Sequence, residues 1–224
     1  MQAELIVMLT HNDITVDNAK ELFESCKDLP VRFWGFKDVG ISREETIALV
    51  DLMKKNGKVT FLEVVTYSEE ECLESAQLAI DAGFEYLTGT LFYPSVVELL
   101  KGTGIKYYPF VGDVGGSPVT LKGALEEILA DAKRLEKAGV SGLDLVAYRY
   151  ADGDPVELAK KLVAAASADV IIAGSISSVE RLRVVDNINP FAFTMGGALF
   201  DGKFAPDGDF RENLEAVVDV MASI

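Results

Sequence analysis

Short apolar runs alternate with longer amphipathic stretches along the whole chain. Most of the apolar runs have no charged residue in their interior, which is typical of parallel strands that are covered on both faces. We expect eight such strands, over residues 5–9, 31–36, 59–65, 86–89, 107–111, 143–147, 170–173 and 191–195.

The stretches between these runs have the helical period of 3.6 residues. The clearest apolar face is formed by Leu121, Leu125, Ile128, Leu129, Ala132 and Leu135. Capping boxes predict where helices begin; they pair Ser42 with Glu45, Ser68 with Glu71, and Ser177 with Glu180. Asp154 precedes Pro155 as a cap residue, and glycines 57, 83, 104 and 139 indicate helix ends.

Eight strand–helix units in 224 residues predict a single (β/α)8 TIM barrel over residues 1–224, in the α/β class. An open doubly wound sheet is the alternative architecture. No linker or low-complexity segment divides the chain, so we expect one domain. In a barrel, functional residues lie in the loops that follow the strands.

Charge and composition narrow the range of partners. The net charge of −15 disfavours binding to nucleic acid or to an anionic membrane surface. No apolar run approaches the roughly 20 residues that span a bilayer, and the N-terminus lacks a signal pattern, so a cytoplasmic location is expected. The single histidine and the two cysteines, each in a helical pattern, predict neither a zinc site nor a disulfide. We expect no metal and no cofactor; the sequence leaves homo-oligomerisation open.

Glycine-containing turns follow the seventh and eighth predicted strands. They place Gly174 and Ser175 after one strand, and Gly196 and Gly197 after the next. These adjacent loops form the usual phosphate site of barrels, where backbone N–H groups at a helix start bind the anion. The simpler interpretation is that the glycines only permit tight turns. Two such turns at neighbouring positions favour a phosphate site.

Several segments resemble one family. They are residues 112–123, 132–140, 177–180 and 196–204, together with Gly89 and Thr90. The chain resembles the histidine-biosynthesis barrel that isomerises phosphoribosyl-formimino aminoimidazole carboxamide ribotide, within the ribulose-phosphate-binding barrel group. The resemblance implies that Asp113 is the family's catalytic aspartate on strand five, and that Thr90 contributes to substrate binding.

Other positions depart from this family. Thr10 stands where the family has its second catalytic aspartate. The turn after the third strand, residues 63–66, has no glycine, and Ala147 and Tyr148 replace a threonine–aspartate pair. We therefore expect a divergent relative with a different, singly phosphorylated substrate.

Charged residues at the ends of predicted strands supply candidate chemistry. Lys37 and Glu63 lie within apolar barrel strands, where an unpaired charge costs several kcal/mol. They predict either a structural ion pair, a general acid/base pair, or a Schiff-base lysine with a carboxylate helper. His11 is a further candidate proton carrier.

Substrate-binding candidates are Asp38 beside Lys37, and Arg149 after the sixth strand. Arg149 would bind a carboxylate or second anion if it faces the barrel interior. The alternative to a catalytic role for Asp113 is a hydrogen bond to the local backbone. Asp13, which follows the first predicted strand, could instead cap the first helix.

Together these features predict a metal-independent enzyme for a small phosphosugar-like metabolite. Isomerisation or epimerisation by proton transfer is the leading hypothesis. The alternatives are a Schiff-base aldolase or lyase that uses Lys37, and a non-catalytic phosphometabolite-binding barrel.

Overall fold

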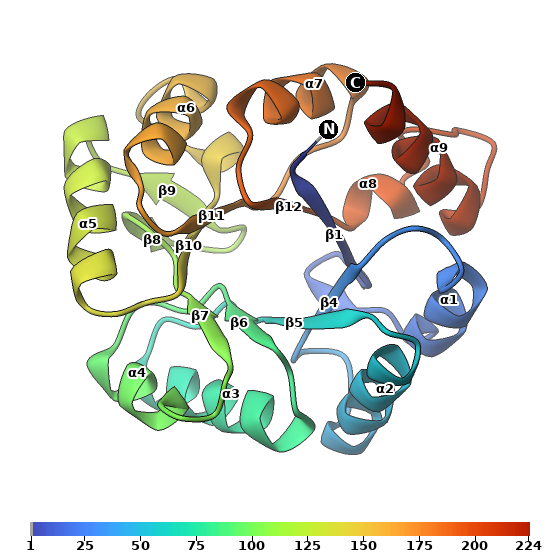
Figure 1. Cartoon of the computed structure of the whole chain (residues 1–224), viewed down its shortest axis with the longest axis horizontal. Helices are drawn as coiled ribbons and strands as arrows, with labels where there is room; N and C mark the ends of the chain where they lie inside the picture. The colour runs from blue at the N-terminus through green and yellow to red at the C-terminus, as the bar shows by residue number, and fades with distance from the viewer. Residues whose placement is uncertain (1) are drawn as a thin grey trace.

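A computed structural model describes residues 2–224, and within them eight parallel strands form a barrel (Figure 1). In barrel order after β10 come β11, β12, β1, β4, β5, β6 and β7. The strands are β1 (Glu4–Met8), β4 (Phe33–Lys37), β5 (Val59–Glu63), β6 (Tyr86–Thr88), β7 (Lys106–Tyr108), β10 (Gly142–Leu145), β11 (Asp169–Ile172) and β12 (Ala192–Met195). Each matches a predicted strand, which confirms the (β/α)8 architecture and excludes the open sheet.

Backbone hydrogen bonds close the barrel between β7 and β10. The amide of Ser141 donates to Tyr107 O at 3.0 Å, and the amide of Asp144 donates to Pro109 O at 2.9 Å. Phe110 also forms a parallel bridge with Asp144. Closure satisfies the backbone groups that an open sheet would leave at its edges.

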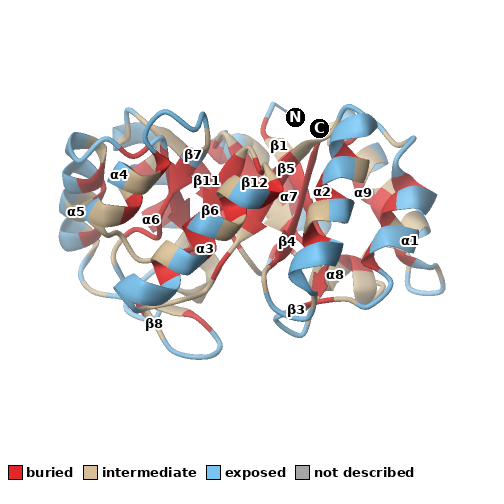
Figure 2. Cartoon of the chain, turned by 90° about the horizontal axis from the view of Figure 1, so that it is seen from below, coloured by how far each residue is buried: buried red, intermediate tan, exposed pale blue. Residues whose placement is uncertain are grey.

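Two small hairpins that the sequence analysis did not anticipate stand at the carboxyl end of the barrel. One contains β2 (Thr10–His11) and β3 (Ile14–Thr15), and the other contains β8 (Asp113–Gly115) and β9 (Thr120–Lys122). Figure 2 shows β3 and β8 at the side of the molecule opposite the chain termini. They therefore extend the wall of the mouth, where barrels place their functional loops.

Helices surround the barrel as an outer layer (Figure 1). They are α1 (Ala19–Cys26), α2 (Arg43–Lys55), α3 (Glu69–Ala82), α4 (Pro94–Leu100), α5 (Leu125–Lys137), α6 (Pro155–Ala165), α7 (Val179–Ile188), α8 (Gly197–Phe200) and α9 (Phe210–Ser223), with a 3-10 turn η1 (Ala147–Arg149). The two cysteines are buried in α1 and α3. No helix among residues 2–224 combines the length and apolarity needed to cross a membrane.

Helix caps test the predicted starts directly. Ser42 and Ser68 form the expected capping boxes, and Asp154 caps α6 by accepting from the Glu157 amide. The predicted box at Ser177 is wrong, because Ser178 is the cap of α7 and accepts from the Arg181 amide. Leu121 lies in β9 rather than in α5, since the chain forms a hairpin before the helix begins.

Aromatic side chains fill the barrel below its mouth. Strand alternation turns Phe33, Phe61, Tyr86 and Tyr108 inward, and the Phe61 and Tyr86 rings stack at 4.0 Å between centroids. Trp34 and Phe36 point to the helical layer instead. Trp34, Phe36 and Phe61 are thus all core residues, and Lys37 and Glu63 lie above the aromatic packing at the ends of their strands.

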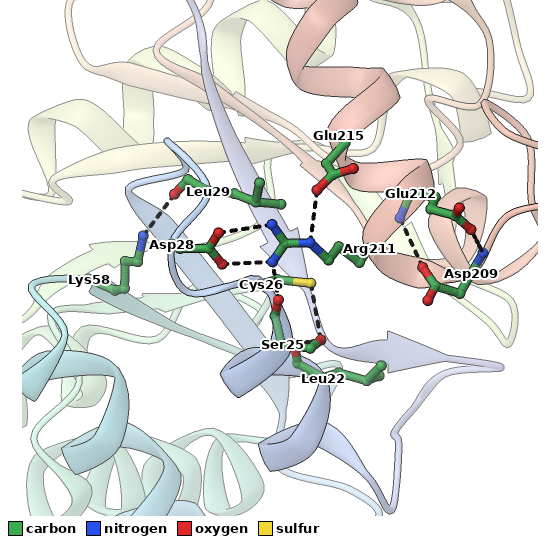
Figure 3. A network of polar contacts seen from close by, with 10 residues as sticks. All are labelled: Leu22, Ser25, Cys26, Asp28, Leu29, Lys58, Asp209, Arg211, Glu212 and Glu215. Atoms are coloured by element: carbon green, nitrogen blue, oxygen red, sulfur yellow. Dashed lines mark hydrogen bonds and ion pairs between the residues drawn. The ribbon is translucent and has the colours of Figure 1, made fainter.

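An ion-pair network joins the first and last helices (Figure 3). The Arg211 guanidinium in α9 donates both Nη atoms to the Asp28 carboxylate, at 2.7 and 2.8 Å, while its Nε lies 2.8 Å from Glu215. The Arg211 hydrogen bonds lower the pKa of Asp28 to about 2. This fork ties the end of α1 to α9, which lies next to it around the barrel.

Replacing Gly142 with alanine should destabilise the barrel. A Cβ atom at position 142 would lie 1.3 Å from Cε1 of Tyr108, whose ring is held by its neighbours and by an O–H donated to Asp169 at 3.0 Å. We expect a loss of at least about 2 kcal/mol, or roughly 4 °C or more in Tm, in thermal denaturation. Gly115→Ala is the control, because a Cβ there meets no described atom within 4 Å. Equal Tm values for the two variants would contradict this packing.

Candidate active site

A cavity of about 460 Å³ opens at the carboxyl end of the barrel. Its wall contains Lys37, Glu63 and Arg149, and also both glycine-containing loops, at Gly174–Ser175 and Gly196–Gly197. The other charged groups on the wall are Asp13, Arg181, Asp201 and Lys203. A chain of net charge −15 thus gathers basic side chains around one small cavity.

Lys37 is the buried cation at the centre of this wall. It is the last residue of β4 and faces inward with Gly35 and Phe33, two and four residues earlier. The side chain is 8% exposed, and its Nζ lies 2.9 Å from Asp13 Oδ1 and 3.9 Å from Glu63 Oε1. The pair expected between Lys37 and Glu63 is therefore present, but the closer partner is Asp13.

The β2–β3 hairpin brings Asp13 to Lys37. Asn12 and Asp13 have φ values of 50° and 64°, so consecutive left-handed residues form the turn between the two short strands. This is the pattern of a type I′ turn, for which asparagine and aspartate are well suited. Asp13 does not cap the first helix, since Asn18 occupies that position.

Burial and charge move the two carboxyl pKa values in opposite directions. The hydrogen bond from Lys37 lowers the pKa of Asp13 below its ordinary 3.8. Burial raises the pKa of Glu63 above its ordinary 4.5, although the nearby Lys37 and Arg149 charges oppose the rise. Carboxyl groups whose pKa values diverge are typical of acid/base sites.

The loop after β11 is held open toward the cavity. Gly174 and Ser175 both have positive φ, 77° and 60°, and the Gly174 amide donates to Thr194 Oγ1 at 3.1 Å. The Arg181 guanidinium donates to Ser175 O and stacks 4.5 Å above the Tyr148 ring. Arg149 lies beside Gly174, where an added Cβ would be 3.4 Å from its Nε.

The two glycines after β12 differ in what constrains them. A Cβ at Gly196 would lie 2.7 Å from Thr10 O and 2.9 Å from Met8 O, so this glycine is required by the contact with the β1 segment. At Gly197 a Cβ would meet no described atom within 4 Å, and the residue faces the cavity. Gly197 is therefore the better position for testing a ligand at this loop.

His11 and Asp38 are not among the described residues that line the cavity. His11 Nε2 lies 3.0 Å from Asp201 Oδ1, and its ring stacks on Phe200 at 5.1 Å, so it fixes the β2–β3 hairpin to α8. Asp38 follows Lys37 and points to the opposite side of the strand, where Ser75 Oγ donates to it at 3.4 Å. The structure does not bring either residue to the cavity.

Thr90 and Asp113 also lie elsewhere in the described chain. Thr90 is fully buried behind the barrel wall and bonds to the Tyr107 hydroxyl at 2.7 Å. Asp113 is exposed in the β8–β9 hairpin, where it pairs in register with Lys122. The fifth strand ends at Tyr108 and the chain turns at Gly112, with φ 84°, before it reaches Asp113. The hairpin returns Val119, not Asp113, to the cavity wall.

Several site residues were missed by the sequence analysis, or given no role in the cavity. Arg181 and Lys203 have no strand-end position that would single them out. Thr10 lines the cavity, and its buried hydroxyl has no hydrogen-bond partner among residues 2–224. Asp144 interrupts a leucine-rich strand, and this charge in an apolar run was a usable signal. Within the described residues no group of three or more histidine, cysteine or carboxylate side chains is arranged to hold a metal ion.

Comparison with known proteins supports the fold. No protein-family model matches the sequence, and no curated protein matches it. Among solved structures, a native KDPGal structure superposes with a TM-score of 0.67 at 14% identity, over 99% of this chain and 98% of the other. The N-acetylmannosamine-6-phosphate 2-epimerase from Clostridium perfringens gives a TM-score of 0.65 at 13% identity, over 87% and 86% of the chains. Tryptophan synthase from M. tuberculosis gives 0.69 at 12% identity, over 100% and 93%.

These similarities define the class of protein. The chain is a single TIM barrel, and at identities of 12 to 14% the likeness extends to the fold alone. The relationship to the histidine-biosynthesis isomerase is not shown by these comparisons.

The Asp13–Lys37 ion pair should make stability depend on pH. Because the pKa of Asp13 is lowered on folding, its contribution is present above about pH 3.8 and is lost as the pH falls through the lower folded value. Asp13→Asn should therefore unfold more easily than the wild type near pH 6, by at most about 1 kcal/mol since Asp13 is half exposed. The difference should shrink below pH 3.8 in denaturant titrations; a difference that grows on acidification would contradict the pair.

Proposed function

We propose that this barrel is an isomerase or epimerase that transfers a proton within a small phosphorylated carbonyl compound. The observation that carries the proposal is the inward-facing pair at the cavity wall: the buried Lys37 ammonium and the Glu63 carboxyl, whose pKa burial raises. A carboxyl tuned toward neutral pH beside a fixed cation is suited to removing a proton next to a carbonyl group.

In the proposed reaction Lys37 binds the carbonyl oxygen and Glu63 transfers the proton. The Lys37 ammonium donates a hydrogen bond to the substrate carbonyl oxygen. The Glu63 carboxylate takes a proton from the adjacent carbon, and the electron pair of the broken C–H bond moves to the oxygen to give an enediolate. Return of the proton to the same carbon on its other face gives the epimer. Return to the former carbonyl carbon, with transfer of the hydroxyl proton to the former carbonyl oxygen, gives the isomer, and neither outcome needs a redox step.

The substrate phosphate would lie at the loops after β11 and β12. Backbone amides near Gly197 and the side chains of Arg149, Arg181 and Lys203 supply donors and positive charge on that side of the cavity. The resemblance of residues 177–180 and 196–204 to the histidine-biosynthesis isomerase supports this assignment and a divergent relationship to that family. It no longer supports a role for Asp113, which lies on the exposed hairpin.

The geometry favours proton transfer over Schiff-base chemistry. An imine requires Lys37 to attack as the neutral amine, whereas the Asp13 carboxylate at 2.9 Å stabilises the charged ammonium. A binding protein without catalytic activity would not need a buried lysine beside a half-buried carboxyl group at the cavity wall, because such groups are costly to desolvate.

A negative side chain at the phosphate loop should weaken anion binding. Gly197→Glu adds a carboxylate where no described atom lies within 4 Å, so repulsion should raise the Kd for inorganic phosphate at least about tenfold in isothermal titration calorimetry. Gly115→Glu adds the same charge on the β8–β9 hairpin, away from the cavity, and should leave the Kd unchanged. Equal affinities for the two variants would rule out the loop as the phosphate site.

Removing the titrating group of Glu63 should abolish turnover without unfolding the protein. In Glu63→Gln, Asp13 still pairs with Lys37, so the fold and phosphate affinity should persist while the rate falls by about 10² to 10⁴. The assay is proton–deuterium exchange, followed by NMR, in a panel of three- to six-carbon aldose and ketose phosphates. Wild-type exchange should decline on acidification at a higher pH than an ordinary glutamate would give. Covalent trapping of a substrate on Lys37 by borohydride would instead establish the Schiff-base lyase.

A further inference from the structure

A second carboxyl group lies below the cavity, on a different wall from Glu63. Asp144 is in β10, and strand alternation turns it inward together with Gly142, whose position abuts the ring of Tyr108 inside the barrel. The cavity is lined by Phe110, which forms the β-bridge with Asp144. It is also lined by Val146, two residues after Asp144 in the chain. Asp144 itself is not among the described residues that line the cavity; it lies on the inner face of the barrel between residues that do.

Asp144 is buried without a hydrogen-bond partner for one of its oxygens. The residue is 2% exposed, and Oδ1 has no partner among the described residues. Native proteins rarely leave a buried carboxyl oxygen unsatisfied, because its desolvation costs free energy that nothing returns. An unsatisfied carboxyl beneath a polar cavity is therefore a candidate for contact with a ligand.

Glu63 and Asp144 approach the barrel axis from well-separated strands. Going around the closed barrel, β6 and β7 lie between β5 and β10 on one side, and β4, β1, β12 and β11 lie between them on the other. A substrate carbon held in the cavity above the aromatic core would therefore have these two carboxyl groups on different faces. Lys37 extends from β4, on the same side as Glu63.

We infer that Asp144 is a second catalytic residue, the acid that returns a proton to the face of the substrate carbon opposite Glu63. This inference rests on the proposed function and narrows it: the chain inverts the configuration of a carbon next to a carbonyl group, so its substrate class is a pair of phosphorylated epimers.

The proton balance of this reaction is complete. Glu63 takes the proton from one face, and the C–H electrons move to the carbonyl oxygen as an enediolate held by Lys37. Asp144 then delivers its carboxylic acid proton to the opposite face, and the enediolate electrons form the new C–H bond. Glu63 ends protonated and Asp144 ionised, so exchange with solvent, or a turnover in reverse, restores the starting state.

The charges around Asp144 agree with this role. Burial raises the pKa of Asp144 well above 3.8, the Glu63 carboxylate raises it further, and Lys37 opposes the rise. Arg149 and Asp13 act on the pKa of Glu63 in opposite directions. Two carboxyl groups that share a low-dielectric site raise each other's pKa, and this favours the neutral acid that the proposed role requires of Asp144.

Deuterium exchange with the same panel of sugar phosphates separates the two roles. The wild type should invert the reacting carbon and introduce one deuterium. Asp144→Asn should lose inversion at least about 100-fold but still exchange the proton of the one epimer that faces Glu63. Asp38→Asn removes a half-buried carboxyl group that follows β4 and faces Ser75 outside the cavity, and this variant should behave as wild type. If Asp144→Asn inverted the carbon as fast as the wild type, the inference would be overturned but the proposed function would stand. If exchange did not depend on Glu63, or if the wild type exchanged no compound of the panel, the proposed function itself would be contradicted.

A substrate-free measurement decides the inference in either case. Carbon-13 NMR of protein labelled at aspartate carboxyl groups identifies the Asp144 signal as the one that disappears in Asp144→Asn. In the wild type this signal should have the chemical shift of a protonated acid at pH 7. In Glu63→Gln its pKa should fall, because the neighbouring negative charge is gone. An Asp144 signal that is ionised at pH 7, or one that does not respond to Glu63→Gln, would overturn the inference.

Discussion

Closure of the barrel between β7 and β10 is the constraint on which the site depends. The hydrogen bonds from Ser141 and Asp144 to β7 and the residues after it join the ends of the sheet, so every inward position must share one narrow interior. Below the mouth that interior is filled by stacked aromatic rings. Lys37 and Glu63 lie above this packing, at the carboxyl ends of their strands, where they line the cavity. The cavity is therefore a consequence of how the barrel is filled.

The charged groups at this mouth differ in how far a partner offsets the cost of their desolvation. Lys37 is nearly buried but has a carboxylate at hydrogen-bond distance, which keeps the ammonium favourable. Glu63 and Asp144 lack comparable partners, and burial raises the pKa values of both. A structural role would be served by one balanced ion pair. The surplus carboxyl groups fit the proposed proton transfer to a ligand, with the proposed phosphate loops on the adjoining wall.

Strand periodicity and capping residues were enough to predict the eight strands and the single barrel, because these are local signals. The same signals indicated Lys37, Glu63 and the glycine loops, since a charge at the end of an apolar strand is costly to bury and a glycine there lets the backbone approach a ligand. The predicted site residues were wrong where the direction of a side chain or a reversal of the chain determines whether a residue reaches the cavity. Asp38 follows Lys37 by one residue and so faces the other side, and the hairpin after Gly112 carries Asp113 away from the mouth. Asp13 reaches Lys37 through a type I′ turn, which the Asn12–Asp13 pair favours but which strand periodicity does not reveal.

The most direct test is a crystal structure of the wild-type protein soaked with a ketose phosphate from the exchange panel. The account predicts the phosphate group at the loops of Gly174–Ser175 and Gly196–Gly197. It also predicts that the carbonyl oxygen lies within hydrogen-bond distance of Lys37 Nζ, with Glu63 against the adjacent carbon. A sugar phosphate bound with its carbonyl end away from Lys37, or bound outside this cavity, would contradict the account.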